Sequence, residues 1–238
     1  MVDARVRPFA RVADLVDYLL YDSSRPTTLI VCSTRAKFLE QLAASVSKRI
    51  RESQDQISSE EPLHSLEANR ESIQSRPPDP LLTKTIGILA NSRSVRLVFC
   101  TSLEHLRAYL SSLGTGLRKG SAGQDTARGT RIVVVDLVAL HYMSTEFSAQ
   151  GLLRTLALAV ETAARITSSL VLCECEDAMV ARNPNRGQRL WDLHVPIVSG
   201  TARLQDGVRQ ITVKQVAQRW FRFEGEDRIT VERGASKD

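Results

Sequence analysis

Glycine and aromatic residues are both scarce in this chain of 238 residues. The first of its 12 glycines is Gly87, which excludes a glycine-rich phosphate-binding loop from the amino-terminal part of the chain. Aromatic residues make up 5% of the chain, so the core must be mostly aliphatic. No apolar run reaches the roughly 18 residues of a membrane-spanning helix, and the opening stretch MVDARVRPFARVADLVDYLL carries acids where a signal peptide would be apolar. We therefore expect an intracellular protein.

Cysteine and histidine are too few and too scattered to form a recognisable reactive centre. The cysteines lie in apolar runs, and their closest pair reads CEC rather than CxxC, so we expect reduced core thiols. A four-cysteine metal site gathered from three strands is the alternative. No two histidines have metal-ligand spacing, and no G-x-S-x-G elbow occurs, so the sequence predicts no metal, no cofactor and no catalytic residue. These residues are Cys32, Cys100, Cys173, Cys175, His64, His105, His141 and His194.

What the chain does contain is a regular alternation of apolar strands and amphipathic helices. Strands are predicted at 25–34, 94–100, 131–140 and 168–176. Helices are predicted at 10–21, 35–50, 81–92, 102–113 and 148–167. Alternation implies parallel strands with crossover helices. The fold class is therefore α/β, with a mostly parallel sheet flanked by helices.

The carboxyl-terminal part differs, because short strand-like runs follow one another there. Stretches 197–205, 209–217 and 219–224 each resemble a strand, and Asp206-Gly207 is a hairpin turn signal between the first two. Residues from about 51 to 80 are rich in Ser, Gln, Glu and Arg, which indicates a surface insertion or a disordered loop. We expect one domain over residues 1–238, with this polar insertion and a short tail at 234–238.

Two stretches carry a resemblance to a known family. They are IVVVDLVALHYMSTEFSAQGLLRTLALAVETAAR and TARLQDGVRQITVKQVAQRWFRFEGEDRI, within a matching region from about Thr27 to Ile229. The order of elements resembles the RecA/Rad51 core, and most of all noncatalytic Rad51 paralogues and Shu-complex subunits of the Psy3/Csm2 type. That resemblance implies a single RecA-like domain in the nucleus. It also implies DNA binding as a heterodimer or larger complex with another RecA-like subunit, in support of recombinase filaments during homologous recombination repair.

Two other functions remain open from the same fold. Accessory subunits of Elongator are also RecA-like and lack ATPase motifs, which would make the chain a cytoplasmic protein of tRNA modification. A scaffold without nucleic acid is the other alternative. In either case no membrane is expected, and the apolar residues of 10–21 either dock a partner subunit or cover their own sheet.

The sequence argues against ATP hydrolysis. A P-loop, G-x-x-x-x-G-K-[ST], joins the first strand to its helix so that backbone amides wrap the phosphates. Taking 25–34 as the first strand, that position reads VCSTRAKFL, and Cys32 to Lys37 contains no glycine. Asp136 ends the strand RIVVVD as a degenerate Walker-B-like residue, where we expect it to accept hydrogen bonds from loop amides. A single anion at the turn into the helix is conceivable.

Positive charge gathers in two irregular stretches, and the whole chain has a net charge of +5 and a pI near 9.2. The stretch 116–131 has four basic residues against one acid, and 181–189 has three and no acid. Flexible arginines suit sequence-independent phosphate contacts. Trp191 is expected to pack its loop rather than stack on a base. The predicted nucleic-acid-binding residues are Arg118, Lys119, Arg128, Arg131, Arg182, Arg186 and Arg189.

Overall fold

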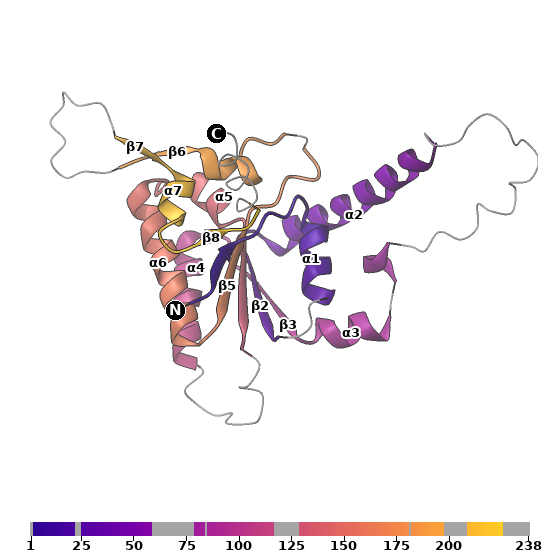
Figure 1. The fold of residues 1–238 in the computed structure, drawn as a ribbon, viewed down its shortest axis with the longest axis horizontal. Coiled ribbons are helices and arrows are strands. Elements are labelled where there is room, and N and C mark those ends of the chain that lie inside the picture. Colours follow the sequence, from indigo (N-terminus) through magenta and orange to yellow (C-terminus); the bar gives the residue numbers. More distant parts are fainter. Residues whose placement is uncertain are drawn as a thin grey trace, which may run out of the picture.

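In the computed structural model the chain forms one six-stranded parallel sheet with helices on both faces (Figure 1). The structure describes residues 2–21, 25–58, 79–83, 85–116, 129–180, 182–197 and 209–225. The strands lie in the order β3-β2-β4-β5-β1-β8. Their bounds are β1 Ala4–Val6, β2 Thr27–Val31, β3 Val95–Phe99, β4 Arg131–Val135, β5 Ser169–Cys173 and β8 Arg222–Phe223. The predicted α/β class is confirmed.

The helices divide between the two faces of the sheet. Figure 1 shows α1 (Val12–Tyr21) and α2 (Arg35–Ser58) on one face and α4 (Leu103–Gly116) and α6 (Ala149–Arg165) on the other. Shorter elements complete the fold at the ends of the sheet. They are α3 Ile86–Ser92, α5 Leu137–Tyr142, α7 Val213–Ala217, the 3-10 turns η2 Pro80–Leu82 and η3 Gln188–Asp192, and the antiparallel pair β6 His194–Pro196 and β7 Gln210–Thr212.

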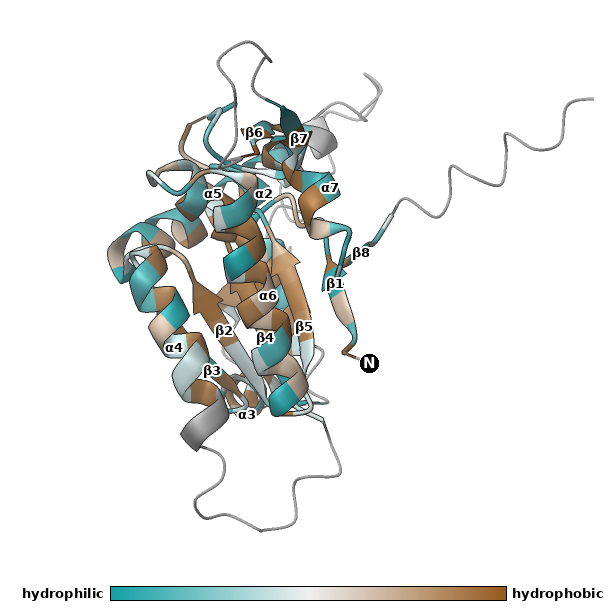
Figure 2. Cartoon of the chain, turned by 90° about the vertical axis from the view of Figure 1, so that its left-hand side faces the viewer, coloured by the Kyte–Doolittle hydropathy of each residue, from teal (hydrophilic) through white to brown (hydrophobic). Residues whose placement is uncertain are grey.

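Burial on both faces explains why the central strands are apolar throughout. All five residues of β4 are buried, and alternate side chains enter two separate core clusters. Ile132 and Val134 pack against α4 and α6, whereas Val133 and Val135 pack against α1. Figure 2 shows the brown strands behind α4 and α6, whose outward faces are hydrophilic. Two-sided burial of this kind is typical of parallel sheets with crossover helices.

Strand register brings polar residues together at the carboxyl edge of the sheet. Val31, Val135 and Cys173, the last residues of β2, β4 and β5, are aligned across the sheet. The residues that follow these strands therefore emerge at the same level. Two of them are the acids Asp136 and Glu174.

The structure departs from the sequence predictions at both ends of the chain. Strand β1 was not predicted, because three residues give too short a pattern to recognise. The segment Val213–Ala217 was predicted as part of a strand and is a helix, begun by a capping box in which Thr212 and Gln215 bond each other's backbone N–H groups. β8 does not join the hairpin but pairs with β1 in the main sheet.

Other predictions fall partly outside the described residues. The pairing of β6 with β7 confirms a hairpin, although the predicted turn at Asp206-Gly207 is not among the residues described. Helix α2 runs to Ser58, into the segment predicted to be irregular, and 59–78 are not described. All four cysteines are buried free thiols, as expected. Within the described ranges no helix has the length and apolarity needed to cross a membrane.

Among the glycines that the structure describes, Gly151 is the one where an added Cβ would meet the backbone most closely. A Cβ there would lie 2.1 Å from the backbone oxygen of Glu146, so the start of α6 would have to shift. We predict that Gly151→Ala lowers the free energy of unfolding by about 1–3 kcal/mol, measured by urea denaturation. Gly87→Ala is the control, because its nearest neighbour would be Thr85 Oγ1 at 3.9 Å. Equal stability of the two variants would contradict the prediction.

Candidate functional site

A polar cleft of about 490 Å³ lies at the carboxyl ends of the central strands. Its walls come from the start of α2, from Thr101 after β3, from Asp136 and α5 after β4, and from the loop that follows β5. The chain continues from β2 to β3 on one side and from β4 to β5 on the other, so the direction of connection reverses between β2 and β4. Open α/β sheets bind ligands at such a point. We therefore take this cleft as the candidate functional site.

Asp136 lines the cleft, and only 3% of its surface is exposed. Its backbone has φ of 61°, a left-handed conformation that Asp tolerates better than most residues and that turns β4 sharply into α5. Oδ1 accepts a hydrogen bond from the backbone N–H of Cys175 at 3.2 Å, and Oδ2 is paired with the guanidinium of Arg186. Burial raises the pKa of Asp136, while Arg186 and the Cys175 amide oppose that rise.

Glu174 is a second buried acid beside Asp136, and the sequence analysis did not single it out. Its carboxylate oxygens accept from the backbone N–H groups of Val138 at 2.7 Å and Ala139 at 3.2 Å, in the first turn of α5. Burial and the neighbouring Asp136 raise the pKa of Glu174, and the hydrogen bonds from the two amides partly offset that rise. The only signal in the sequence was an acid between two cysteines at the end of an apolar strand.

The far wall of the cleft is held by Asp177, which is saturated with hydrogen bonds. Its carboxylate accepts from the side chain of Gln41 at 2.8 Å, from Asn183 at 2.6 Å and from two backbone amides. Burial alone would raise the pKa of Asp177, but these donors lower it on balance. Gln41 also accepts from the amide of Ala178, so this network ties α2 to the loop after β5.

The arrangement of donors leaves little capacity for a metal at this cleft. Both oxygens of Asp136 are taken by protein donors, and so are both oxygens of Glu174. No group of three or more potential metal ligands occurs in the part of the chain that the structure describes. The acids therefore act as anchors for the surrounding loops. The predicted role of Asp136, accepting from a loop amide at a strand end, is confirmed by its bond to Cys175.

In the structure, the position that a P-loop would occupy differs from the one expected from the sequence. Because β1 precedes β2, the first strand-to-helix connection is residues 7–11 between β1 and α1, not Cys32 to Lys37. The assignment of 25–34 as the first strand was therefore wrong. The segment 7–11 reads RPFAR and also has neither glycine nor lysine. The absence of a phosphate-wrapping loop thus holds at both turns.

The basic loop after β5 places its three arginines differently. Arg186 is largely enclosed, with 17% of its side chain exposed, because it reaches down to Asp136. Arg182 and Arg189 are exposed, and neither forms an ion pair within the described residues. Arg182 has φ of 59° in a tight bend, and Arg189 lies in η3. Two of the three predicted residues are thus available at the surface, and the third holds the loop in place.

The other predicted basic residues are not brought together with this loop. Arg118, Lys119 and Arg128 lie outside the described residues. Arg131 is not in an exposed loop but is the first residue of β4, and only 4% of its surface is exposed. Its guanidinium donates to Thr27 Oγ1 at 3.1 Å and to the Tyr18 hydroxyl at 3.0 Å. That placement is at the amino end of the strand, opposite the cleft.

Trp191 was expected to pack its loop against the domain, and it does. Only 3% of its surface is exposed, and its ring meets Phe223 edge to face with centroids 5.3 Å apart. This contact fastens η3 to β8. Trp191 is therefore no stacking platform for a base.

His141 is a buried histidine beneath the cleft, at the end of α5. Its Nε2 lies 3.0 Å from Thr155 Oγ1, and Nδ1 has no hydrogen-bond partner among the described residues. Burial and the nearby Arg107 lower the pKa of His141 to about 4, although Glu146 acts in the opposite sense. The imidazole is therefore neutral at physiological pH and belongs to the core.

The Asp136–Arg186 pair allows a direct test of its anchoring role. We predict that Arg186→Met destabilises the fold by about 3 kcal/mol or more, because it leaves a buried carboxylate without its cation. Adding Asp136→Asn to that variant should restore part of the loss. Arg189→Met, an exposed arginine on the same loop, should change the free energy of unfolding by less than about 0.5 kcal/mol. Urea denaturation measures all three, and an Arg186→Met protein as stable as Arg189→Met would refute the anchor.

His141 predicts a specific dependence of stability on pH. Its pKa is about 4 in the folded protein, against about 6.5 in an unfolded chain, so only the unfolded state takes up a proton as the pH falls between these values. The free energy of unfolding should therefore drop by about 2 kcal/mol from pH 7.5 to pH 5 on account of this residue. Urea denaturation of the wild type and of His141→Gln at both pH values isolates the contribution. An identical drop in the two proteins would contradict it.

Comparison with known proteins connects the chain to one protein family. No curated protein matches the chain, and no solved structure matches it. The family described as SPAC22G7.03-like matches residues 12–224. That span runs from the start of α1 to the residue after β8 and includes the whole cleft. The chain therefore belongs to the SPAC22G7.03-like family.

Proposed function

We propose that the protein is a noncatalytic, RecA-like subunit that binds DNA together with a partner protein and supports assembly of a recombinase filament in homologous recombination repair. The observation that carries the proposal is the charge arrangement around the cleft. Asp136 is engaged by protein donors, whereas Arg182 and Arg189 lie exposed on the neighbouring loop without ion-pair partners in the described ranges. A nuclear location and the recombination setting belong to the same proposal and follow from the resemblance of the sequence.

Two features support a noncatalytic role. The strand-to-helix turns after β1 and after β2 contain no glycine, so neither can wrap a triphosphate with backbone amides. The carboxylate at the end of β4 faces Arg186 instead of open solvent. A nucleotide-bound magnesium ion would have to displace that guanidinium from a buried site. The cleft is therefore better suited to holding its loops than to transferring a phosphoryl group.

The exposed arginines support binding of a polyanion. A guanidinium offers a fork of donors that matches phosphate oxygens, and on a loop it adapts to an irregular backbone. Because the loop is fastened by Arg186 below and by Trp191 at its end, Arg182 and Arg189 are presented from a defined platform. No aromatic ring of this loop is free to read bases. The binding should therefore be sequence-independent and salt-sensitive.

Exposed apolar side chains at the β3 edge support the presence of a partner protein. Tyr21, Leu82, Ile86, Leu89 and Leu97 are between 43% and 87% exposed, on the end of α1 and on the neighbouring η2, α3 and β3. The edge of a sheet also presents unpaired backbone groups. By contrast, the apolar stripe of α1 is buried on its own sheet, so that helix is not the docking surface considered from the sequence.

Charge reversal on the loop tests the proposal. We predict that Arg182→Glu with Arg189→Glu weakens binding of single-stranded DNA by at least tenfold at low salt. The slope of log K against log salt should fall by about 0.7 for each phosphate that the loop no longer neutralises. Arg186 is left in place because it holds the fold. Fluorescence anisotropy with a labelled oligonucleotide over a salt series measures both quantities.

The matched control is Arg93→Glu with Arg154→Glu, which reverses two exposed arginines elsewhere. It has the same net charge as the Arg182→Glu, Arg189→Glu variant. It should bind DNA nearly as the wild type does apart from a general charge effect. Equal loss in both double variants would refute the loop as the DNA contact. A competition experiment addresses the tRNA-related alternative. That alternative would be favoured if tRNA displaced the labelled DNA at a lower concentration than unlabelled DNA does.

A further inference from the structure

The two large apolar side chains before Arg182 in the loop after β5 are exposed. Met179 is 61% exposed and Val180 is 55% exposed, so burial of these side chains contributes little to the conformation of the loop. Arg182 has φ of 59°, a left-handed conformation that a residue with a long side chain keeps only when its surroundings impose it. The described contacts that impose it are polar ones.

Asp177 supplies these contacts from the start of the loop. Its Oδ1 accepts from the backbone N–H groups of Met179 at 2.9 Å and Val180 at 3.1 Å, and its Oδ2 accepts from Asn183 Nδ2 at 2.6 Å. Arg182 lies between the last two of these donors in the chain. A single carboxylate thus fixes the loop on both sides of Arg182, and hydrogen bonds to a charged acceptor are stronger than neutral ones.

Gln41 of α2 holds that carboxylate in place. Its Nε2 donates to Asp177 Oδ1 at 2.8 Å, and its Oε1 accepts from the backbone N–H of Ala178 at 2.8 Å. Only 9% of Gln41 is exposed, so water competes little for these two bonds. Helix α2 is itself packed on the sheet through Phe38. The start of the loop is therefore fixed relative to the sheet and not only by contacts within the loop.

Gln41 and Asp177 act on a different part of the loop from Arg186. The pair between Arg186 and Asp136 fixes the later part, whereas Asp177 fixes the part that carries Arg182. Neither residue is suited to touch a polyanion, because Gln41 is buried and the carboxylate of Asp177 would repel phosphate. Any effect of these two residues on binding must therefore act through the loop.

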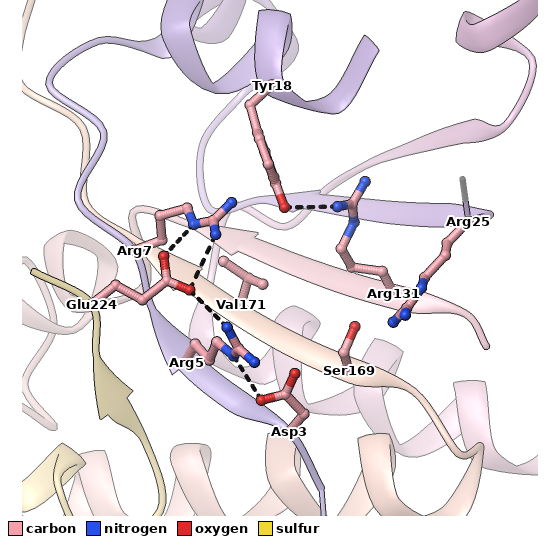
Figure 3. Close-up of a pocket in the computed structure, with 9 residues that line it drawn as sticks. All are labelled: Asp3, Arg5, Arg7, Tyr18, Arg25, Arg131, Ser169, Val171 and Glu224. Atoms are coloured by element: carbon pink, nitrogen blue, oxygen red, sulfur yellow. Dashed lines mark hydrogen bonds and ion pairs between the residues drawn. The ribbon is translucent and has the colours of Figure 1, made fainter. Parts of the chain in front are cut away.

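The arginines of a second pocket, which lies beside α1 and has a volume of about 270 Å³, are engaged by other side chains (Figure 3). Glu224 pairs with Arg5 and Arg7, and Arg131 donates to the Tyr18 hydroxyl. Three of the four arginines that line this pocket are therefore held within the protein. The loop after β5 instead presents two arginines without ion-pair partners among the described residues, so its conformation bears directly on the proposed contact with DNA.

We propose that Gln41 and Asp177 are positioning residues for DNA binding, because they hold Arg182 in the conformation in which it meets the phosphates. This role rests on the DNA-binding function proposed above. A loop that is ordered before binding loses less conformational entropy when it binds. Loss of either residue should therefore weaken DNA binding, although neither touches DNA.

Two single variants test this role through the affinity for single-stranded DNA. Gln41→Met keeps the length and the charge of the side chain but can form neither hydrogen bond to the loop. It should weaken binding by about three- to tenfold, because the loop must then be ordered when DNA binds. Asp177→Ala should weaken binding by a similar factor. Fluorescence anisotropy with a labelled oligonucleotide measures both, at a temperature where each protein is folded.

The Asp177→Ala variant separates positioning from charge. Removal of a carboxylate makes the loop more positive, so electrostatic attraction alone would strengthen binding. Weaker binding therefore supports the positioning role, whereas binding as tight as that of the wild type or tighter would overturn it.

A variant that loses stability elsewhere is the control for a general effect on the fold. Thr85→Ala removes the side chain that caps α3, far from the loop, and should leave DNA affinity unchanged. A loss of affinity in Thr85→Ala as large as that in Gln41→Met would show that reduced stability alone weakens binding, and the positioning role would be refuted.

Hydrogen exchange of the full-length protein without DNA measures the order of the loop directly. The N–H groups of Met179 and Val180, which donate to Asp177, should exchange at least about fivefold faster in Gln41→Met than in the wild type, while those of β4 keep their rates. Unchanged exchange of these two amides would overturn the positioning role. If they exchange faster but the wild type does not bind DNA, the DNA-binding function fails while the ordering of the loop by Gln41 is confirmed.

Discussion

The ion pair between buried Asp136 and Arg186 is the constraint on which the carboxyl end of the sheet depends. A carboxylate with almost no exposure is costly unless a cation and a hydrogen bond compensate it, and Arg186 and the Cys175 amide do so. The pair joins the turn after β4 to the loop after β5, and Glu174 joins that same edge to α5. The position of the exposed arginines follows from it, since Arg186 anchors the segment that carries them.

Acidic and basic groups are arranged differently in the cleft at the carboxyl end of the sheet and in the pocket beside α1. At the carboxyl end, the acids Asp136, Glu174 and Asp177 are consumed by internal donors, and exposed cations remain around them. On the face of the sheet beside α1, Tyr18 and Glu224 hold arginines around a pocket. The loop thus presents exposed arginines, whereas the arginines of the pocket are held by an aromatic ring and by carboxylates.

Much of the sheet was predictable, because apolar runs with two-sided burial leave a strong local pattern. The strands β2, β3 and β5 and the helices α4 and α6 lie where their periodicity placed them. The strand predicted at 131–140 is only partly correct, because β4 ends at Val135 and Leu137–Tyr142 forms helix α5 after the left-handed turn at Asp136. β1 was missed because its three residues alternate between core and arginine, and only pairing with β5 makes them a strand. The stretch at α7 was predicted as a strand because its β-branched residues suit either structure. A capping box at Thr212 decided in favour of a helix.

By itself the sequence determined that no turn into the first helices contains glycine, that the thiols lie in apolar strands, and that arginines cluster in two stretches. Those properties are local, since they depend on residue type and spacing alone. Only the tertiary structure decided which arginines reach the surface. Arg186 meets an acid 50 positions away, and Arg131 of β4 is enclosed by Tyr18 of helix α1. Whether a charge is buried or free depends on partners distant in the chain, and spacing along the sequence does not encode them.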